Sequence, residues 1–132
     1  MLLNVVHAKG RIFVDVPVEI GLPDEPTLQD LIEVLPAAAA AARASDPSGH
    51  FAGLEIAEGV RRDWIVEGRG ANGQPWSREA WAVQPGEAAL QAVVALLEET
   101  RAVRVSDVPA LVDVMRHMTV TAVLPGDAAP AP

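Results

Sequence analysis

The architecture of this chain follows from residues 61–84, RRDWIVEGRGANGQPWSREAWAVQ. Two segments rich in β-branched and aromatic residues, Arg61–Arg69 and Pro75–Gln84, flank the dipeptide Asn72-Gly73. Such segments favour extended strands, and Asn-Gly is among the strongest two-residue turn signals. The pattern therefore predicts a β-hairpin with its tip at Asn72 and Gly73.

The predicted turn determines which residues of the two strands face each other. If Asn72 and Gly73 alone form the turn, three favourable cross-strand pairs result: Trp64 with Trp81, Glu67 with Arg78, and Arg69 with Trp76. An aromatic pair, an ion pair and a cation–π contact each stabilise neighbouring strands. Their agreement in one register predicts that Trp64 and Trp81 share a face of the hairpin.

Trp76 is the predicted binding residue, because the same register places it on the polar face with Glu67, Arg69 and Arg78. An exposed tryptophan flanked by two arginines resembles the anchor residues that dominate protein interfaces. We therefore expect these four residues to form an interaction surface. The alternative is that Arg69 covers Trp76 within the monomer, or that a helix packs over it.

A second hairpin is predicted at the N-terminus. β-branched runs at Leu2–Ala8 and Ile12–Ile20 surround Lys9-Gly10, which we expect to form the turn. In that register Val5 lies opposite Val14. The core face then consists of alternating apolar residues, namely Leu3, Val5, Ile12, Val14 and Val16.

The first 35 residues resemble the start of the ubiquitin-like β-grasp proteins. The residues that carry the resemblance are the N-terminal hairpin and then the segment PTLQDLIEVL at 26–35. Thr27 is a suitable N-cap for a helix there, and the leucines and isoleucine have the spacing of one buried stripe. The resemblance implies a sheet packed by a helix. Sulfur-carrier members of the superfamily end in Gly-Gly, whereas the last residues here are Pro130-Ala-Pro132, so conjugation chemistry is not implied.

The remaining sequence alternates short elements. We predict strands and helices at the following places: strands at Ala52–Glu58, Ala102–Val105 and Thr119–Leu124, and helices beginning at Pro85 and at Ser106 or Asp107. The sequence contains no internal repeat. We therefore predict one α+β domain over residues 1–124, in which a mixed or antiparallel sheet of two hairpins and C-terminal strands is packed by two to three helices. Residues 125–132, rich in Pro and Ala, are predicted to form a disordered tail.

Composition limits the classes of partner and chemistry. Ten basic against eighteen acidic residues give a net charge of −8, whereas nucleic acids and anionic membranes require a basic surface. We therefore expect neither as a partner. The chain has no Cys, which excludes disulfides, thiolate metal sites and a cysteine nucleophile. Because the N-terminus also lacks a basic leader, we expect a cytoplasmic, bacterial-type protein.

The run Gly68–Gly73 matches the G-x-G-x-x-G letters of a dinucleotide-binding loop. Such a loop joins a strand to a helix whose N-terminus binds pyrophosphate, but here a strand follows. We interpret the run as a hairpin turn and expect no cofactor. Three histidines, His7, His50 and His117, lack metal-ligand spacing, so no metal site is predicted either.

Two functions fit these patterns. The one we favour is a non-catalytic accessory, adaptor, inhibitor or assembly protein, which binds another protein or a second copy of itself through its acidic surface and the Trp-bearing hairpin. The alternative is a small-molecule-binding protein or enzyme whose site forms from separated residues, with His50 as general base near Arg61, Arg62 and Asp63.

Overall fold

The computed structural model describes residues 1–70 and 72–126. The strands in these ranges are β1 (Leu2–Lys9), β2 (Ile12–Glu19), β3 (His50–Ile56), β4 (Arg62–Arg69), β5 (Pro75–Ala82) and β6 (Thr119–Pro125), and the helices are α1 (Leu28–Ser45), α2 (Pro85–Thr100) and α3 (Val108–Met115). The strands form two antiparallel sheets, ordered β2-β1-β3 and β5-β4-β6, which confirms the predicted α+β class. No helix of the described part is long and apolar enough to cross a membrane.

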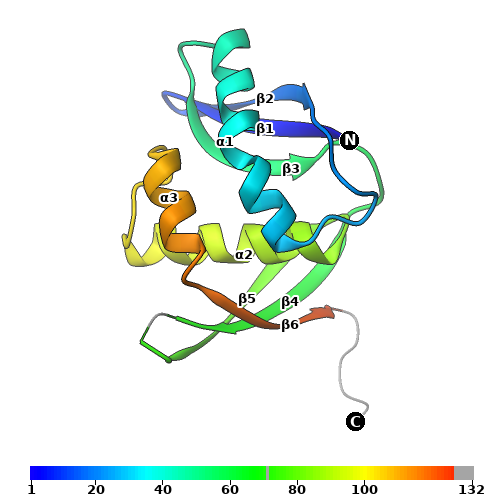
Figure 1. The fold of residues 1–132 in the computed structure, drawn as a ribbon, viewed down its shortest axis with the longest axis vertical. Coiled ribbons are helices and arrows are strands. Elements are labelled where there is room, and N and C mark those ends of the chain that lie inside the picture. The colour runs from blue at the N-terminus through cyan, green and yellow to red at the C-terminus, as the bar shows by residue number, and fades with distance from the viewer. Residues whose placement is uncertain (71, 127–132) are drawn as a thin grey trace.

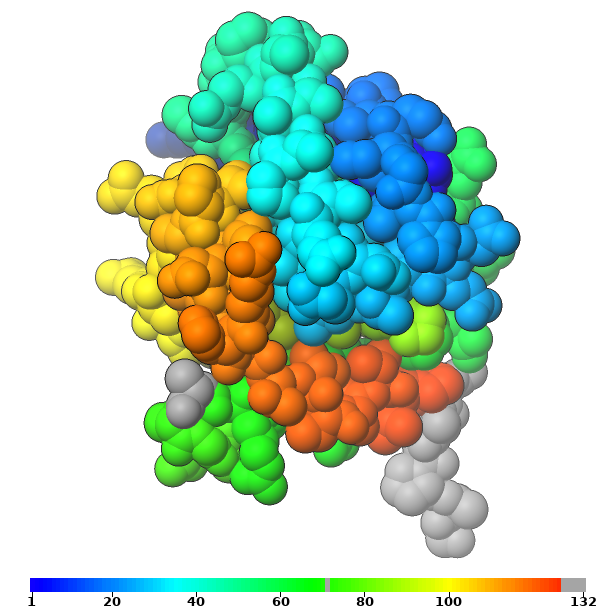
Figure 2. All heavy atoms as spheres, viewed as in Figure 1, coloured from blue at the N-terminus to red at the C-terminus, as the bar shows by residue number. Residues whose placement is uncertain are grey.

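Helix α2 crosses the middle of the molecule between the two sheets, with α1 over the first sheet (Figure 1). One side of α2 contributes large residues to the core shared with the first sheet, α1 and α3: Leu90, Val93 and Leu97. The other side contributes small residues to the core of the second sheet: Ala88, Ala89 and Ala92. Because side-chain length sets the distance between packed elements, the alanines let α2 lie close to the second sheet. Helices α1 and α3 and strand β6 lie on the face shown in Figure 2.

The two halves of the chain share one connectivity. In each half a hairpin is followed by a helix and then by a strand that pairs antiparallel with the first hairpin strand, giving β1-β2-α1-β3 and β4-β5-α2-β6, with α3 inserted before β6. Each closing strand contains a residue skipped by the pairing, Ala52 in β3 and Thr121 in β6. The shared connectivity is visible in the topology although the sequence contains no repeat.

The N-terminal hairpin has the predicted strands but a different turn. Lys9 pairs with Ile12, so Gly10 and Arg11 form the turn, and Gly10 adopts a φ of 63° that glycine reaches without strain. Val5 therefore pairs with Val16 instead of Val14, and the predicted register is wrong by two residues. Because a two-residue shift keeps side chains on their faces, the predicted core face is retained. Ile12, however, lies at the end of the hairpin and is 61% exposed.

The central hairpin has a longer loop than predicted. The Gly70 amide donates to the Gln74 carbonyl and the Gly73 amide donates to the Gly70 carbonyl, so the loop holds three residues instead of two. Gly73 has a φ of 80°, which is typical of the last residue in a three-residue hairpin loop. The run Gly68–Gly73 thus joins two strands, as the hairpin interpretation requires.

Because of the longer loop, Trp76 and Trp81 each lie on the opposite face of the hairpin from the one predicted. Trp64 pairs with Ala80 and is buried, whereas Trp81 pairs with Asp63 and is 55% exposed. The predicted cross-strand pairs are therefore wrong, because a one-residue shift moves every side chain of one strand to the other face. Trp76 lies on the inner face and packs against both clusters of the core.

Two further predictions differ from the structure. Residues Ala102–Val105 form turns and bends rather than a strand. Pro125 is the last residue of β6, and the Gly126 amide donates to the Asp63 carbonyl at 2.8 Å, so the predicted tail does not begin at residue 125. Residues 127–132 of that predicted tail lie outside the described residues.

Candidate functional site

The four residues predicted to form an interaction surface lie on two faces of the second sheet. Glu67 and Arg69 are exposed on the outer face, whereas Trp76 and Arg78 are half-buried on the inner face. The prediction that Trp76 shares a polar face with Glu67 and Arg69 is therefore wrong. The arrangement matches the alternative in which a helix packs over Trp76, since residues of α2 lie beside it.

The two arginines have other partners than those predicted. Arg78 donates from Nη2 to Glu99 Oε2 on α2 at 2.6 Å, instead of pairing with Glu67. Arg69 donates from Nη1 to the Gly73 carbonyl at 3.0 Å, which ties it to the hairpin tip. Arg78 thus ties the hairpin to α2, whereas the bond of Arg69 lies within the hairpin.

The outer face of the second sheet carries apolar side chains from all three of its strands. Trp81 is 55% exposed, Leu124 is 47% exposed, and Ile65 is half-buried between them. Leu124 pairs directly with Ile65, while Trp81 lies diagonally from Ile65 because its direct partner is Asp63. These three residues, Trp81, Ile65 and Leu124, are termed the Trp81 surface below.

Acidic side chains border the Trp81 surface on β4 and β5, while Arg61 and Arg62 line the pocket beside Trp81. Asp63 pairs with Trp81, Glu79 pairs with Ile65, and Glu67 follows Ile65 on the same face of β4. All three carboxylates are exposed, and Arg69 is the basic residue among the outward positions of β4 and β5. The outward positions of β4 and β5 therefore combine an apolar centre with a net negative charge.

A pocket of about 250 Å³ opens beside Trp81 and is lined by Arg61, Arg62 and Asp63. The structure thus brings together three of the residues predicted for a small-molecule site. His50 is not among them, because it begins β3 whereas Arg61 follows the end of that seven-residue strand. The two ends are about 20 Å apart at the usual rise of a strand, so His50 cannot act on a ligand beside Arg61.

Arg61 belongs to a buried network centred on Glu87, whose side chain is 1% exposed. Glu87 accepts from Arg61 Nη1 at 2.9 Å, from the Ile56 amide at 3.1 Å and from the Val83 amide at 2.9 Å, and Gln91 donates to it at 3.2 Å. Arg61 also donates from Nη2 to the Ile56 carbonyl at 2.6 Å. The network joins the ends of β3 and β5 to the first turn of α2. The sequence identified Glu87 only as an acid suited to a helix N-terminus.

A second polar cluster joins β1 to the end of α1. Asp46 Oδ1 accepts from Lys9 Nζ at 2.8 Å and from Ser48 Oγ at 3.2 Å, and Asp46 Oδ2 lies 3.2 Å from Nδ1 of the buried His7. A carboxylate only accepts, so the His7 ring donates from Nδ1. The serine contacts the aspartate rather than the imidazole. The cluster is therefore not a catalytic triad, in which the imidazole must reach the hydroxyl.

The Asp46 cluster makes stability depend on pH. The hydrogen bond from Lys9 lowers the pKa of Asp46, burial opposes this, and the bonds from His7 and Ser48 lower the pKa further. A lowered pKa in the folded state stabilises the fold above the ordinary carboxyl pKa of about 3.9, and this contribution is lost as the pH falls through that value and then the folded one. Asp46→Asn should therefore lower the urea midpoint at pH 7, and its difference from wild type should shrink at pH 3. Asp113→Asn, at an exposed position on α3, is the control, and a difference for Asp46→Asn that is constant with pH would contradict the expectation.

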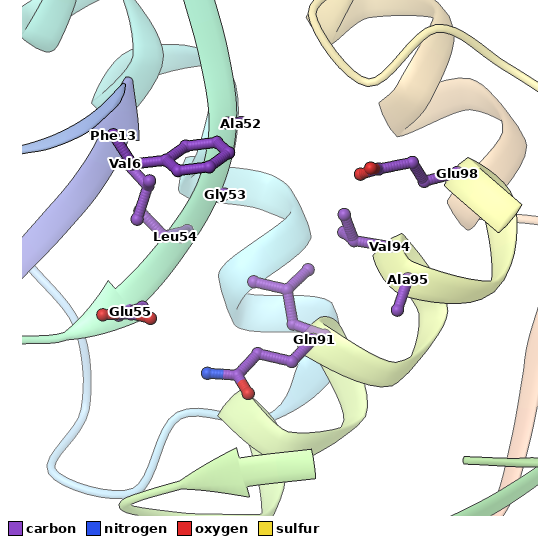
Figure 3. A pocket seen from close by; sticks show the side chains of 11 residues that line it. Val6, Phe13, Ala52, Gly53, Leu54, Glu55, Gln91, Val94, Ala95 and Glu98 are labelled. Atoms are coloured by element: carbon purple, nitrogen blue, oxygen red, sulfur yellow. The ribbon is translucent and has the colours of Figure 1, made fainter. Parts of the chain in front are cut away.

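Another hollow, of about 260 Å³, lies between β3 and α2 (Figure 3). Leu54 and Val94 line it from the two elements, and Phe13, which is 71% exposed, lies at its edge. Its polar side chains include Gln91, which already donates to Glu87. Across the described ranges, no group of three or more His, Cys, Asp or Glu could hold a metal ion.

Comparison with known proteins supplies no relative from which a function could be transferred. No family model matches the chain, and neither the curated proteins nor the solved structures contain a significant match to it. The choice among the candidate sites therefore rests on their geometry and chemistry.

Proposed function

We propose that this chain is a non-catalytic interaction protein that binds a basic protein partner through the Trp81 surface. The observation that carries the proposal is the exposure of Trp81. This residue lies on a regular strand, and it is 55% exposed to solvent. Apolar area of this size is costly to leave in water, and tryptophan is among the residues most enriched at the centres of interfaces. Ile65 and Leu124 extend the apolar area across the sheet.

The charges around the Trp81 surface support a basic partner. Asp63, Glu67 and Glu79 border the apolar centre, and the whole chain has a net charge of −8. A partner with Lys or Arg around an apolar recess would match this pattern and would associate faster at low salt. Pairing of two copies through this face would bring like charges together, so a different protein is favoured over self-association.

A catalytic role has less support. His50 lies far from Arg61, and Arg61 is engaged by Glu87 and the Ile56 carbonyl. The pocket beside Trp81 would instead suit part of an interface, since Trp81 and Asp63 also line it.

Trp81→Ser should remove partner binding while leaving the fold intact, because the side chain is largely exposed. A central interface tryptophan contributes about 2 kcal/mol or more, so the affinity should fall about 30-fold or more. Ile12→Ser is the matched control, since it removes another exposed apolar side chain from the first sheet.

The measurement is a pull-down with mass spectrometry, followed by titration of the recovered protein at two salt concentrations. Support requires a partner that wild type and Ile12→Ser retain, that Trp81→Ser loses, and that Glu79→Arg weakens. The proposal fails if Trp81→Ser retains the partner. It also fails if wild type recovers nothing and light scattering shows a monomer.

A further inference from the structure

A pocket at the tip of the central hairpin offers a binding chemistry that the Trp81 surface lacks. Its volume is about 470 Å³, and its lining residues come from the β4–β5 tip, the C-terminal part of α2 and the end of α3. Its wall is mainly apolar, formed by Trp76, Leu96, Leu97, Val114 and Met118. Both the size and the composition are typical of sites for small molecules.

The indole N–H of Trp76 is a donor without an acceptor. Its Nε1 atom is buried, and no group in the described ranges accepts a hydrogen bond from it. The ring cannot turn freely, because it packs on Gly68, where an added Cβ would lie 2.7 Å from its Cε2. Buried indole N–H groups usually have a partner, since an unpaired buried donor is unfavourable.

The surroundings of Trp76 favour an uncharged partner. Helix α2 ends at Thr100, so its last carbonyls and their partial negative charge lie at this end of the pocket. Glu98 and Glu99 are exposed on the same turn. The Thr100 hydroxyl already donates to the Leu96 carbonyl at 2.9 Å. The other side-chain donors of the lining, the amides of Asn72 and Gln74, are exposed at the hairpin tip, so the indole N–H is the buried donor beside the apolar wall.

We infer that this pocket binds a small, neutral, mostly apolar molecule with one oxygen acceptor, a carbonyl or an ether, which accepts from Trp76 Nε1. The apolar wall holds the body of the molecule, and the buried indole donor orients it. Because the nitrogen is covered, a side chain must move to admit the acceptor. Met118 lines the pocket, and its unbranched side chain is the most adaptable one there.

Two probes of nearly the same shape test the inference. Acetophenone has a carbonyl where ethylbenzene has a methylene. The chain contains three Trp, so its proton–nitrogen spectrum has three indole cross-peaks, and Trp76→Phe identifies the one from Trp76. Acetophenone should move this cross-peak downfield to saturation. Ethylbenzene should shift only the methyl groups of the pocket and bind about 3- to 10-fold more weakly, as the loss of one hydrogen bond implies.

Two variants complete the test. Trp76→Phe keeps a ring and removes the donor, so it should bind both probes with equal affinity. Thr100→Phe, at an exposed position on the pocket edge, should prevent binding of both, while unchanged Trp64 and Trp81 cross-peaks report an intact fold. The inference is overturned if acetophenone perturbs no pocket residue, if wild type binds the two probes equally, or if Trp76→Phe keeps the preference.

Discussion

Replacing Glu87 by Ala should lower the free energy of unfolding by about 3–5 kcal/mol, the range expected when one partner of a buried ion pair is removed. The carboxylate is 1% exposed and accepts from Arg61 and from the amides of Ile56 and Val83. Without it, a guanidinium and two backbone N–H groups lose their acceptor in a region that water reaches poorly. The loss should appear as a lower urea midpoint at an unchanged slope.

Two further variants isolate the cause. Glu98→Ala removes an exposed carboxylate from the same helix and should change stability by no more than about 0.5 kcal/mol. Glu87→Gln keeps an acceptor oxygen without the charge, so its loss should lie between the two. A loss below about 1 kcal/mol for Glu87→Ala would show that the network contributes little, because an unsatisfied buried group alone costs about that much.

Gly68→Ala should destabilise the second sheet by about 1–3 kcal/mol, the usual cost of forcing atoms into a packed core. An added Cβ would collide with the Thr119 carbonyl oxygen of β6 and with the ring of Trp76. Since the carbonyl belongs to the backbone, it cannot move without disturbing the pairing of β4 with β6. We expect a lower urea midpoint together with a red-shifted tryptophan emission as Trp76 is displaced.

Gly53→Ala is the matched control, because it makes the same change in a strand of the first sheet. There the nearest atom to an added Cβ is Val6 Cβ at 3.9 Å, an ordinary contact. Stability should stay within about 0.5 kcal/mol of wild type. Equal losses for the two variants would mean that close packing of Trp76 on Gly68 is not what requires glycine there.

Local pattern was sufficient to predict both hairpins and the helices, because alternation and capping act over a few residues. The pairing was not predictable, since the run around Asn72-Gly73 fits a loop of either two or three residues. That choice alone decides whether Trp81 lies inside or outside. One signal favoured the outside: Glu79 and Trp81 share a face, while Ala80 and Ala82 alternate with them and can pack under α2.

The candidate sites depend on contacts between distant segments, which local pattern does not contain. The burial of Glu87 arises only when the ends of β3 and β5 meet the start of α2. His50 is likewise separated from Arg61 because it begins β3, whereas Arg61 follows the other end of that strand. From the sequence alone, the two residues lie on neighbouring segments. Trp76 was predicted to lie on an exposed polar face, whereas the residues that surround it in the structure include members of α2 and α3.

The two sides of α2 impose different limits on how this chain can evolve. Where the helix meets the first sheet through Leu90, Val93 and Leu97, one aliphatic residue can replace another if total volume is kept. Where it meets the second sheet through Ala88, Ala89 and Ala92, any larger residue pushes the helix away from the strands. Accepted mutations on that side are restricted to residues about the size of alanine. Drift in the first sheet can proceed one position at a time, whereas the second sheet and α2 must change together.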